Sequence, residues 1–460
     1  MLDHTIAAIS TSLSASGIGI VRISGDEAIA IADRLFQSHK KKQLKDQKTH
    51  TLHYGHIVDP KEDEIVDEVL VSIMRGPDTY TKEDIIEING HGGVIVMQRI
   101  LQLVLTHGAT LAEPGEFTKR AFLNGRLDLS GAEAVIDIIN AKTNLGLKSS
   151  MHQLKGAVYY HVEEVRREIL ELMAHIEASI DYPEYDIEEL SDDHVMGKLE
   201  RIAKGIHKMI QSSEVGKMIR EGIKTAIVGK PNVGKSSLLN ALLKEDRAIV
   251  TDIAGTTRDV LEEYMNLLGI PVRIMDTAGI RQTDDEVEKI GVTKSKAVVE
   301  DADLVIMMLD ASQKITKEDR YILDLVVDKQ VIVLLNKIDL SMEIKEDDIR
   351  ALIEGVTVIP TSVVDERGLE ELQKVIKDMF LLGDIAMDDG LYITNVRHKV
   401  SLERALKSVE AVKASIQMGM PEDCWSIDLK NAYGDLGEIT GDHVSDDLIE
   451  EIFSQFCLGK

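Results

Sequence analysis

The sequence predicts an α/β plus all-α protein in which a doubly wound α/β unit is inserted into a helical domain. Three observations support this fold class. Short β-branched runs bounded by glycine alternate with helical patterns near the start of the chain and again in its middle. Elsewhere, apolar residues recur with the 3.6-residue period of amphipathic helices. A single core rarely serves a chain of 460 residues, so two or three domains are expected.

Composition narrows the class of protein. A hydrophobic content of 44% with only 4% aromatic residues indicates a soluble, helix-rich chain. No apolar run approaches the roughly 20 residues of a membrane span, so we expect a cytoplasmic protein without membrane association. Two cysteines, Cys424 and Cys457, do not make a disulfide framework. The formal charge of -27 argues against a surface that binds nucleic acid over its whole extent, so any RNA contact is local or supplied by a partner.

Residues 1–124 are expected to form an α/β unit of their own. His91 lies between glycines, which favours a turn residue over a metal ligand, and no spacing in this unit predicts a metal site. The expected strands cover 17–25, 50–59, 65–76 and 84–93, and the expected helices cover 26–36 and 94–107.

Residues 125–220 and 382–460 are expected to be the two parts of one helical domain, with 221–381 inserted between them. Ser130 and Glu133 have the spacing of a capping box. The apolar positions through Ile180 fit one or two long helices, which Pro183 ends. Further helices are expected over 194–218, over 395–418 and from Trp425 onward.

The stretch GKPNVGKSS, Gly229 to Ser237, matches the phosphate-binding loop pattern G-x4-G-K-S. It lies between a predicted strand, 223–228, and a predicted helix, 237–243. The glycines let backbone N–H groups turn toward a phosphate, and the helix N-terminus adds partial positive charge. Lys235 can reach the outer phosphates, and the hydroxyl of Ser236 can hold Mg²⁺.

Two later segments also follow predicted strands. In DTAG, Asp276 to Gly279, the carboxylate can hold a magnesium-bound water and the last amide can meet a terminal phosphate. In NKID, Asn336 to Asp339, the final carboxylate can accept both donors of the guanine edge. A PTS segment ending at Ser362 follows another strand. In this order the segments predict a Ras-like GTPase domain.

Ile280 occupies the position after DTAG where many small GTPases carry a glutamine that positions water. An apolar side chain does not orient water. Hydrolysis therefore needs another positioning group and another source of transition-state charge.

Four segments make the chain resemble the tRNA wobble-uridine modification GTPases of the MnmE (TrmE) family. They are GIGIVRISG, EINGHGG, GEFTKRAFLNGRLDL, and CLGK after SDDLIEEIF. The resemblance covers essentially the whole chain. It implies a folate-binding N-terminal domain that forms a homodimer, a helical domain split by the GTPase domain, and a separate FAD-containing partner of the MnmG type. The implied reaction installs an aminomethyl or carboxymethylaminomethyl group at C5 of the tRNA wobble uridine, using 5-formyl- or methylene-tetrahydrofolate.

The resemblance also implies a folate site formed by Arg22, Glu87, Arg126 and Lys460. Basic groups suit the folate glutamate tail, and a carboxylate suits the donor edge of a pterin. The family often has lysine where this chain has Arg126, and arginine keeps the charge. Cys457 lies in the same terminal tetrapeptide. It is either a small buried apolar residue or a nucleophile or redox group, and the sequence supplies no neighbouring base to activate it.

For the GTPase domain, the resemblance places K⁺ where an arginine finger would act, and Arg258 does not replace that cation. Glu288 would position the attacking water. The implied K⁺ ligands are Asn232, Thr251, Ile253 and Thr256, and the implied Mg²⁺ ligands are Ser236 and Thr257. The residues expected at the nucleotide are Asn232, Val233, Gly234, Lys235, Ser236, Ser237, Thr251, Asp252, Ile253, Ala254, Gly255, Thr256, Thr257, Asp276, Thr277, Ala278, Gly279, Asn336, Lys337, Asp339 and Ser362.

Two alternatives stay open at this point. An Era-like ribosome-assembly GTPase shares GTTRD, residues 255–259, and the missing glutamine. A GTP-driven dimerisation switch would only remodel a partner. Binding of a reduced folate would distinguish the function implied by the MnmE (TrmE) resemblance from both alternatives.

Overall fold

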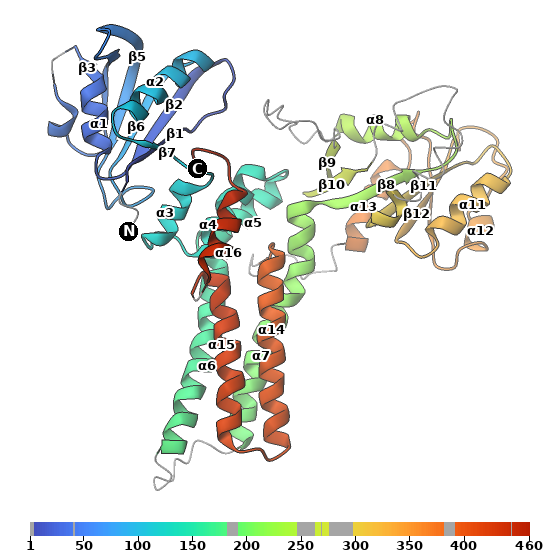
Figure 1. The fold of residues 1–460 in the computed structure, drawn as a ribbon. Coiled ribbons are helices and arrows are strands. Elements are labelled where there is room, and N and C mark those ends of the chain that lie inside the picture. The colour runs from blue at the N-terminus through green and yellow to red at the C-terminus, as the bar shows by residue number, and fades with distance from the viewer. Residues whose placement is uncertain are drawn as a thin grey trace.

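The structure is a computed structural model that describes residues 4–39, 42–181, 192–245, 263–267, 269–275, 298–380, 392–442 and 444–460. Two α/β units lie on either side of the upper end of a bundle of long helices (Figure 1). The C-terminal segment returns from the bundle toward the N-terminal unit, so residues far apart in the sequence meet there.

The N-terminal unit contains a seven-stranded sheet in the order β3-β4-β5-β6-β2-β1-β7. Two helices cover one face of it, where the apolar residues of alternate strand positions form the core. The opposite face carries the half-exposed and exposed positions of the central strands. The strands are β1 Ile6–Ile9, β2 Ser16–Ser24, β3 Phe36–Ser38, β4 Thr51–Asp59, β5 Glu64–Met74, β6 Ile85–Gly92 and β7 Thr110–Leu111, and the helices are α1 Ala28–Leu35, the 3-10 turn η1 Leu44–Asp46, and α2 Val94–Thr106.

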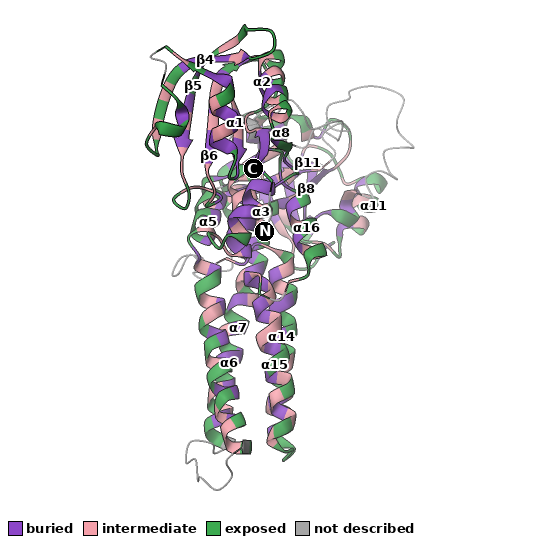
Figure 2. Cartoon of the chain, turned by 60° about the vertical axis from the view of Figure 1, so that its left-hand side comes forward, coloured by how far each residue is buried: buried purple, intermediate pink, exposed green. Residues whose placement is uncertain are grey.

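The helical part contains a four-helix bundle of α6, α7, α14 and α15. Buried positions line the inside of the bundle and exposed positions its outside (Figure 2), as expected for helices with an apolar stripe. Shorter helices join it to the N-terminal unit. The helices are α3 Glu116–Leu123, α4 Leu129–Asn140, α5 Asn144–Leu154, α6 Ala157–Asp181, α7 Asp192–Glu221, α14 Val396–Gln417, α15 Glu422–Thr440 and α16 Asp446–Ser454.

The middle unit contains a six-stranded sheet in the order β13-β12-β11-β8-β10-β9. Five strands are parallel, and β9 is antiparallel to β10. Apolar side chains fill both faces, with α8 and α13 on one side and α11 and α12 on the other. The elements are β8 Ile223–Val228, α8 Lys235–Glu245, β9 Glu263–Leu267, β10 Ile270–Ile274, β11 Leu304–Asp310, α11 Lys317–Val326, β12 Val331–Asn336, α12 Glu346–Arg350, β13 Thr357–Pro360 and α13 Leu369–Phe380.

The start of the helical part differs from expectation. Asp128, rather than Ser130, caps α4, and its side chain accepts the Gly131 N–H. Glu133 makes no capping box because it faces the buried interior and binds Arg397 and His398. The capping-box prediction is therefore wrong.

The region through Ile180 forms three helices rather than one or two. Thr143 caps α5, accepting the Gly146 N–H at 3.1 Å. Gly156, at φ +90°, then separates α5 from α6. The predicted turn at His91 is also wrong, because His91 belongs to β6 and its ring contacts Asp67 at 2.7 Å.

Two carboxylates of α4 contact the segments on either side of the inserted unit, an arrangement we call the α4 junction. Glu133 accepts from Arg397 at 2.8 Å and from His398 at 2.7 Å, both after the unit. Asp137 pairs at 2.9 Å with Arg220, just before the unit. Burial alone would raise the pKa of Glu133, but His398 and Arg397 lower it to about 2. The junction therefore holds an ionised carboxylate.

Candidate functional site

The carboxyl ends of the parallel strands bring the predicted motifs to one edge of the middle sheet, which we call the nucleotide edge. The loop 229–234 follows β8, and Asn336 ends β12. The segment containing Ser362 follows β13. In doubly wound sheets, ligands bind at this edge.

The loop itself needs glycine at two positions. Gly229 has φ +144°, and a Cβ there would lie 2.5 Å from the Met308 carbonyl oxygen. Gly234 has φ +109°, and a Cβ would collide with the Asn336 amide. Both conformations are accessible mainly to glycine. The backbone thus approaches its neighbours too closely for any side chain.

Asn336 joins three segments at this edge. Its side-chain amide donates to the Val233 carbonyl at 2.8 Å, and its oxygen accepts from the Val363 N–H at 3.1 Å. The residue is only 4% exposed. A buried amide with both ends bonded fixes the loop relative to β12 and to the segment after β13.

Lys235 begins α8 and points back over the loop. Its ammonium group donates to the carbonyls of Gly229 and Lys230, each at 2.7 Å. Burial lowers the pKa of Lys235. A cation at a helix N-terminus, close to inward-turning amides, is a favourable setting for phosphate.

The far end of the edge carries the residues predicted to recognise the base. The exposed Asp339 accepts from the Ser362 hydroxyl at 2.8 Å, and Ser362 is itself fully buried. Lys337, at φ +67°, binds the Asp310 carboxylate at 2.7 Å. The structure thus brings Lys337, Asp339 and Ser362 to the same end of the sheet.

Asp310 was not among the residues predicted from sequence. Burial would raise its pKa, yet hydrogen bonds from Lys337 and Ser312 hold the pKa below its ordinary value. The signal was a single acidic residue closing the apolar run of β11. Asp310 holds the Lys337 side chain through this hydrogen bond.

The other residues predicted to contact the nucleotide divide into two sets. Asn232, Ser236 and Ser237 lie exposed on the loop and the first turn of α8, and Asn232 has φ +64°. The predicted residues that lie outside the described residues are Thr251, Asp252, Ile253, Ala254, Gly255, Thr256, Thr257, Asp276, Thr277, Ala278, Gly279 and Glu288.

A second group of predicted residues meets in the N-terminal unit, and we call it the terminal contact. Arg22 on β2 and Glu87 on β6 are cross-strand partners, joined by an ion pair at 2.8 Å. Arg22 also donates to the Gly459 carbonyl at 3.3 Å, and Ser10 donates to the same oxygen at 3.0 Å. Lys460 follows directly. The sheet and the C-terminal segment therefore share one site.

Arg126 lies beside Tyr80. Its guanidinium sits 4.6 Å from the Tyr80 ring centroid and donates to the Tyr80 carbonyl at 3.1 Å. The Arg22 guanidinium lies 5.6 Å from the Phe117 ring. Tyr80 and Phe117 pack in the same small apolar cluster, so the two arginines flank it.

Cys457 is exposed. The interpretation of this cysteine as a small buried residue is therefore wrong. The buried aromatic residue of this segment is instead Phe456, which packs against α16. Within the described residues, no helix is long and apolar enough to cross a membrane.

The topology of the middle sheet, the phosphate loop after β8 and the Asn336–Asp339 segment after β12 define a Ras-like GTPase domain. Two sequence profiles match the chain around it. The GTP-binding protein TrmE N-terminus matches residues 5–126, and the MnmE helical domain matches residues 129–457. The chain therefore belongs to the MnmE (TrmE) family.

Individual relatives agree over the full length. The tRNA modification GTPase MnmE of Thermoanaerobacter pseudethanolicus is 55% identical over 100% of both chains. The protein of the same name from Geobacillus thermodenitrificans is 52% identical over 99% of both chains. Among solved structures, the G domain of the T. maritima FeoB iron transporter covers 34% of this chain and 97% of its own, at 28% identity and a TM-score of 0.26.

Proposed function

We propose that this chain is a K⁺-activated GTPase that, with an FAD-containing partner, installs an aminomethyl or carboxymethylaminomethyl group at C5 of the tRNA wobble uridine, using a one-carbon folate. The observation that carries the proposal is the full-length similarity to proteins named tRNA modification GTPase. The nucleotide edge and the terminal contact supply chemistry suited to the two small ligands.

The nucleotide edge fits GTP on its own geometry. Glycine at 229 and 234 lets the loop follow its path against Met308 and Asn336, and Lys235 supplies a cation at the start of α8. Asp339 offers a carboxylate to the guanine donors. The hydroxyl of Ser236 at the start of α8 suits Mg²⁺, with Thr257 as its proposed partner ligand.

The direct test of the function is nucleoside analysis of tRNA from cells that lack this protein. We expect the modified wobble uridine to disappear, to return with the wild-type chain, and not to return with Lys235→Ala. An unchanged wobble-uridine profile would remove the proposal.

The K⁺ proposal rests on Asn232, whose side chain is exposed on the loop. The other proposed ligands are Thr251, Ile253 and Thr256. Hydrolysis should be faster in K⁺ than in Na⁺ at equal ionic strength. Asn232→Ala should abolish that difference, and the matched change Asn240→Ala, at an exposed position of α8, should keep it. Equal rates in both salts for the wild-type chain contradict K⁺ activation.

Glu288 is proposed to position the attacking water because Ile280 does not. Such a contact matters in the transition state and not in the bound ground state, so Glu288→Ala should lower kcat by about 10²-fold with GTP affinity nearly unchanged. Single-turnover hydrolysis and a separate affinity measurement distinguish this outcome from weakened binding.

The folate proposal rests on the donor set of the terminal contact: the Arg22–Glu87 pair, Arg126 beside Tyr80, and Lys460. The carboxylate suits pterin donors and the cations suit the glutamate tail. We expect 5-formyltetrahydrofolate to bind, and Glu87→Gln to weaken it. Glu64→Gln, at an exposed position of β5, is the control. Absence of folate binding favours the Era-like or switch alternatives.

We further propose that residues 1–124 mediate a homodimer in the cytoplasm, with 125–220 and 382–460 as the helical domain and 221–381 as the inserted GTPase domain. Light scattering of the full chain should give twice the monomer mass. A change at Cys457, Cys457→Ser, tests whether this exposed thiol takes part in tRNA modification.

A further inference from the structure

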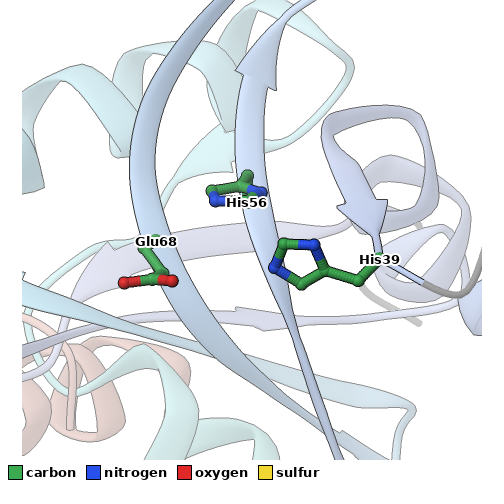
Figure 3. Close-up of side chains that lie close together, drawn as sticks. All are labelled: His39, His56 and Glu68. Carbon is green, nitrogen blue, oxygen red and sulfur yellow. The ribbon is translucent and has the colours of Figure 1, made fainter.

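Two imidazoles and a carboxylate gather on the N-terminal sheet, away from the nucleotide edge. His39 follows β3, His56 lies on β4 and Glu68 lies on β5 (Figure 3). One ligand atom of each lies within 4.8 Å of the other two. No short sequence motif contains all three, which is why the sequence predicted no metal site in this unit.

Strand register explains why they meet. His56 and Glu68 are direct partners across β4 and β5. Gln37 of β3 pairs with His56, which brings His39 alongside Tyr54 at the end of that short strand. Gly55 and Ile57, on either side of His56, are buried. Alternation therefore directs His56 to the other, solvent-facing side of the sheet.

Tyr54 contacts two members of the group. Its ring stacks on His39 with centroids 4.9 Å apart, and its hydroxyl donates to the Glu68 carboxylate. The His39 and His56 rings meet edge to face at 4.8 Å. An outer hydrogen bond that orients a ligating carboxylate is a regular feature of metal sites.

We propose that His39, His56 and Glu68 bind one divalent transition-metal ion of the Zn²⁺ class. Around a tetrahedral ion with bonds of about 2.1 Å, ligand atoms lie roughly 3.4 Å apart. Separations within 4.8 Å close to that value by side-chain rotation, which these exposed or half-exposed residues allow. Two imidazole nitrogens select against Mg²⁺ and Ca²⁺, which prefer oxygen ligands. The three protein ligands leave a fourth position for water.

A bound ion would cross-link three strands. β3 is a three-residue edge strand, held to the sheet by pairs with β4. Edge strands are the least restrained part of a sheet, so an ion joining β3, β4 and β5 stabilises that edge. The formal charge of -27 raises the local concentration of cations. The group shares no residue with the nucleotide edge or the terminal contact.

The test uses the full-length chain, freed of metal with a chelator, with Co²⁺ as the spectroscopic probe and no nucleotide present. The wild-type chain should bind one Co²⁺ more than His56→Gln, with the visible absorption of a four-coordinate ion that the variant lacks. The matched control His53→Gln, on the same strand but outside the group, should keep both. Zn²⁺ should raise the melting temperature of the wild-type chain and not that of His56→Gln.

His39→Gln repeats the measurement at a position outside the strand pairing, so a folding defect in the β4 variant does not decide the outcome. Equal stoichiometry and equal absorption in the wild type and both ligand variants overturn the proposal. A Co²⁺ signal that His53→Gln also loses identifies adventitious binding by surface histidines and overturns it as well.

Discussion

The nucleotide edge and the α4 junction both contain charged hydrogen-bonded groups, but the two regions differ in how far these groups are exposed to solvent. At the nucleotide edge, Lys337 binds Asp310 and Asn336 holds two backbone groups, while Asp339 remains exposed. At the α4 junction, Glu133 is 4% exposed and its oxygens bind residues that lie 262 to 265 positions later. One region leaves a polar group facing solvent, and the other encloses its charge.

The difference shows what each region can do. A charge-assisted hydrogen bond that is open on one side positions a group for a ligand. The same bond, enclosed, makes the partners depend on each other, because removing one leaves a buried charge. The nucleotide edge should therefore respond to substitution mainly in binding, and the α4 junction mainly in stability.

The largest effect is expected for Glu133→Ala. The change leaves Arg397 and His398 in a buried site without their carboxylate, at a cost of about 3–5 kcal/mol in the free energy of unfolding. Urea denaturation of the full chain measures it. Glu164→Ala, at an exposed position of α6, should change stability by less than about 0.5 kcal/mol. Similar effects for both variants would erase the distinction between the two regions.

The pH dependence of stability sharpens the comparison. The pKa of Glu133 falls from an ordinary 4.5 to about 2 on folding, so its contribution is fully present above 4.5 and is lost as pH falls toward 2. That shift corresponds to about 3 kcal/mol. Glu133→Gln should be less stable than wild type at pH 6, and the two should converge in acid.

Asp137 acts in the opposite direction, because burial raises its pKa. The Glu133 charge contributes to that rise, so the difference between the wild-type and Glu133→Gln urea midpoints, measured across pH 2–6, reports Glu133 together with its effect on Asp137. A constant difference over that range contradicts the ionised carboxylate.

At the nucleotide edge, Asp339→Asn should change base preference with little effect on stability. The amide replaces one acceptor by a donor, so GTP affinity should fall by about 10²-fold or more while xanthosine triphosphate gains. Competition binding measures both nucleotides. Asp328→Asn, at an exposed position between α11 and β12, is the control. Retained GTP preference would place guanine recognition elsewhere.

The smallest effect is expected at the terminal contact, where burial is partial. Arg22→Ala removes the half-buried Glu87 ion pair and one donor to the Gly459 carbonyl, and the latter is worth about 1 kcal/mol to the C-terminal segment. Hydrogen exchange in residues 456–460 should rise by about fivefold, with GTP hydrolysis unchanged. Arg34→Ala, which removes a similar contact to the His107 carbonyl, should leave that exchange as it is.

Sequence reasoning worked best where structure is local. The predicted strand 223–228 agrees with β8 and the predicted helix 94–107 agrees with α2, because glycine flanks each apolar pattern. The grouping of the loop with Asn336, Asp339 and Ser362 also followed from strand ends alone, since parallel strands present their carboxyl ends at one edge.

Sequence reasoning worked less well where the role of a residue depends on a partner that is distant in the sequence. Glu133 was interpreted as a capping residue because the sequence does not show Arg397 beside it. The terminal contact had no local signal, and only family resemblance brought Arg22, Glu87 and Lys460 together. The His39 group was missed for the same reason, because cross-strand register is not visible in a single sequence.

The position of Gly459 determines which of the two sites can form first during synthesis. The strands of the N-terminal sheet end at β7, and those of the middle sheet end at β13, after which α13 covers one face. Gly459 lies 437 positions after Arg22, and its backbone approaches β1 so closely that a Cβ would sit 2.5 Å from the Ile9 carbonyl oxygen. A polypeptide released early from the ribosome would therefore carry a finished nucleotide edge and an unfinished terminal contact. The terminal contact therefore forms only after Gly459 has been synthesised.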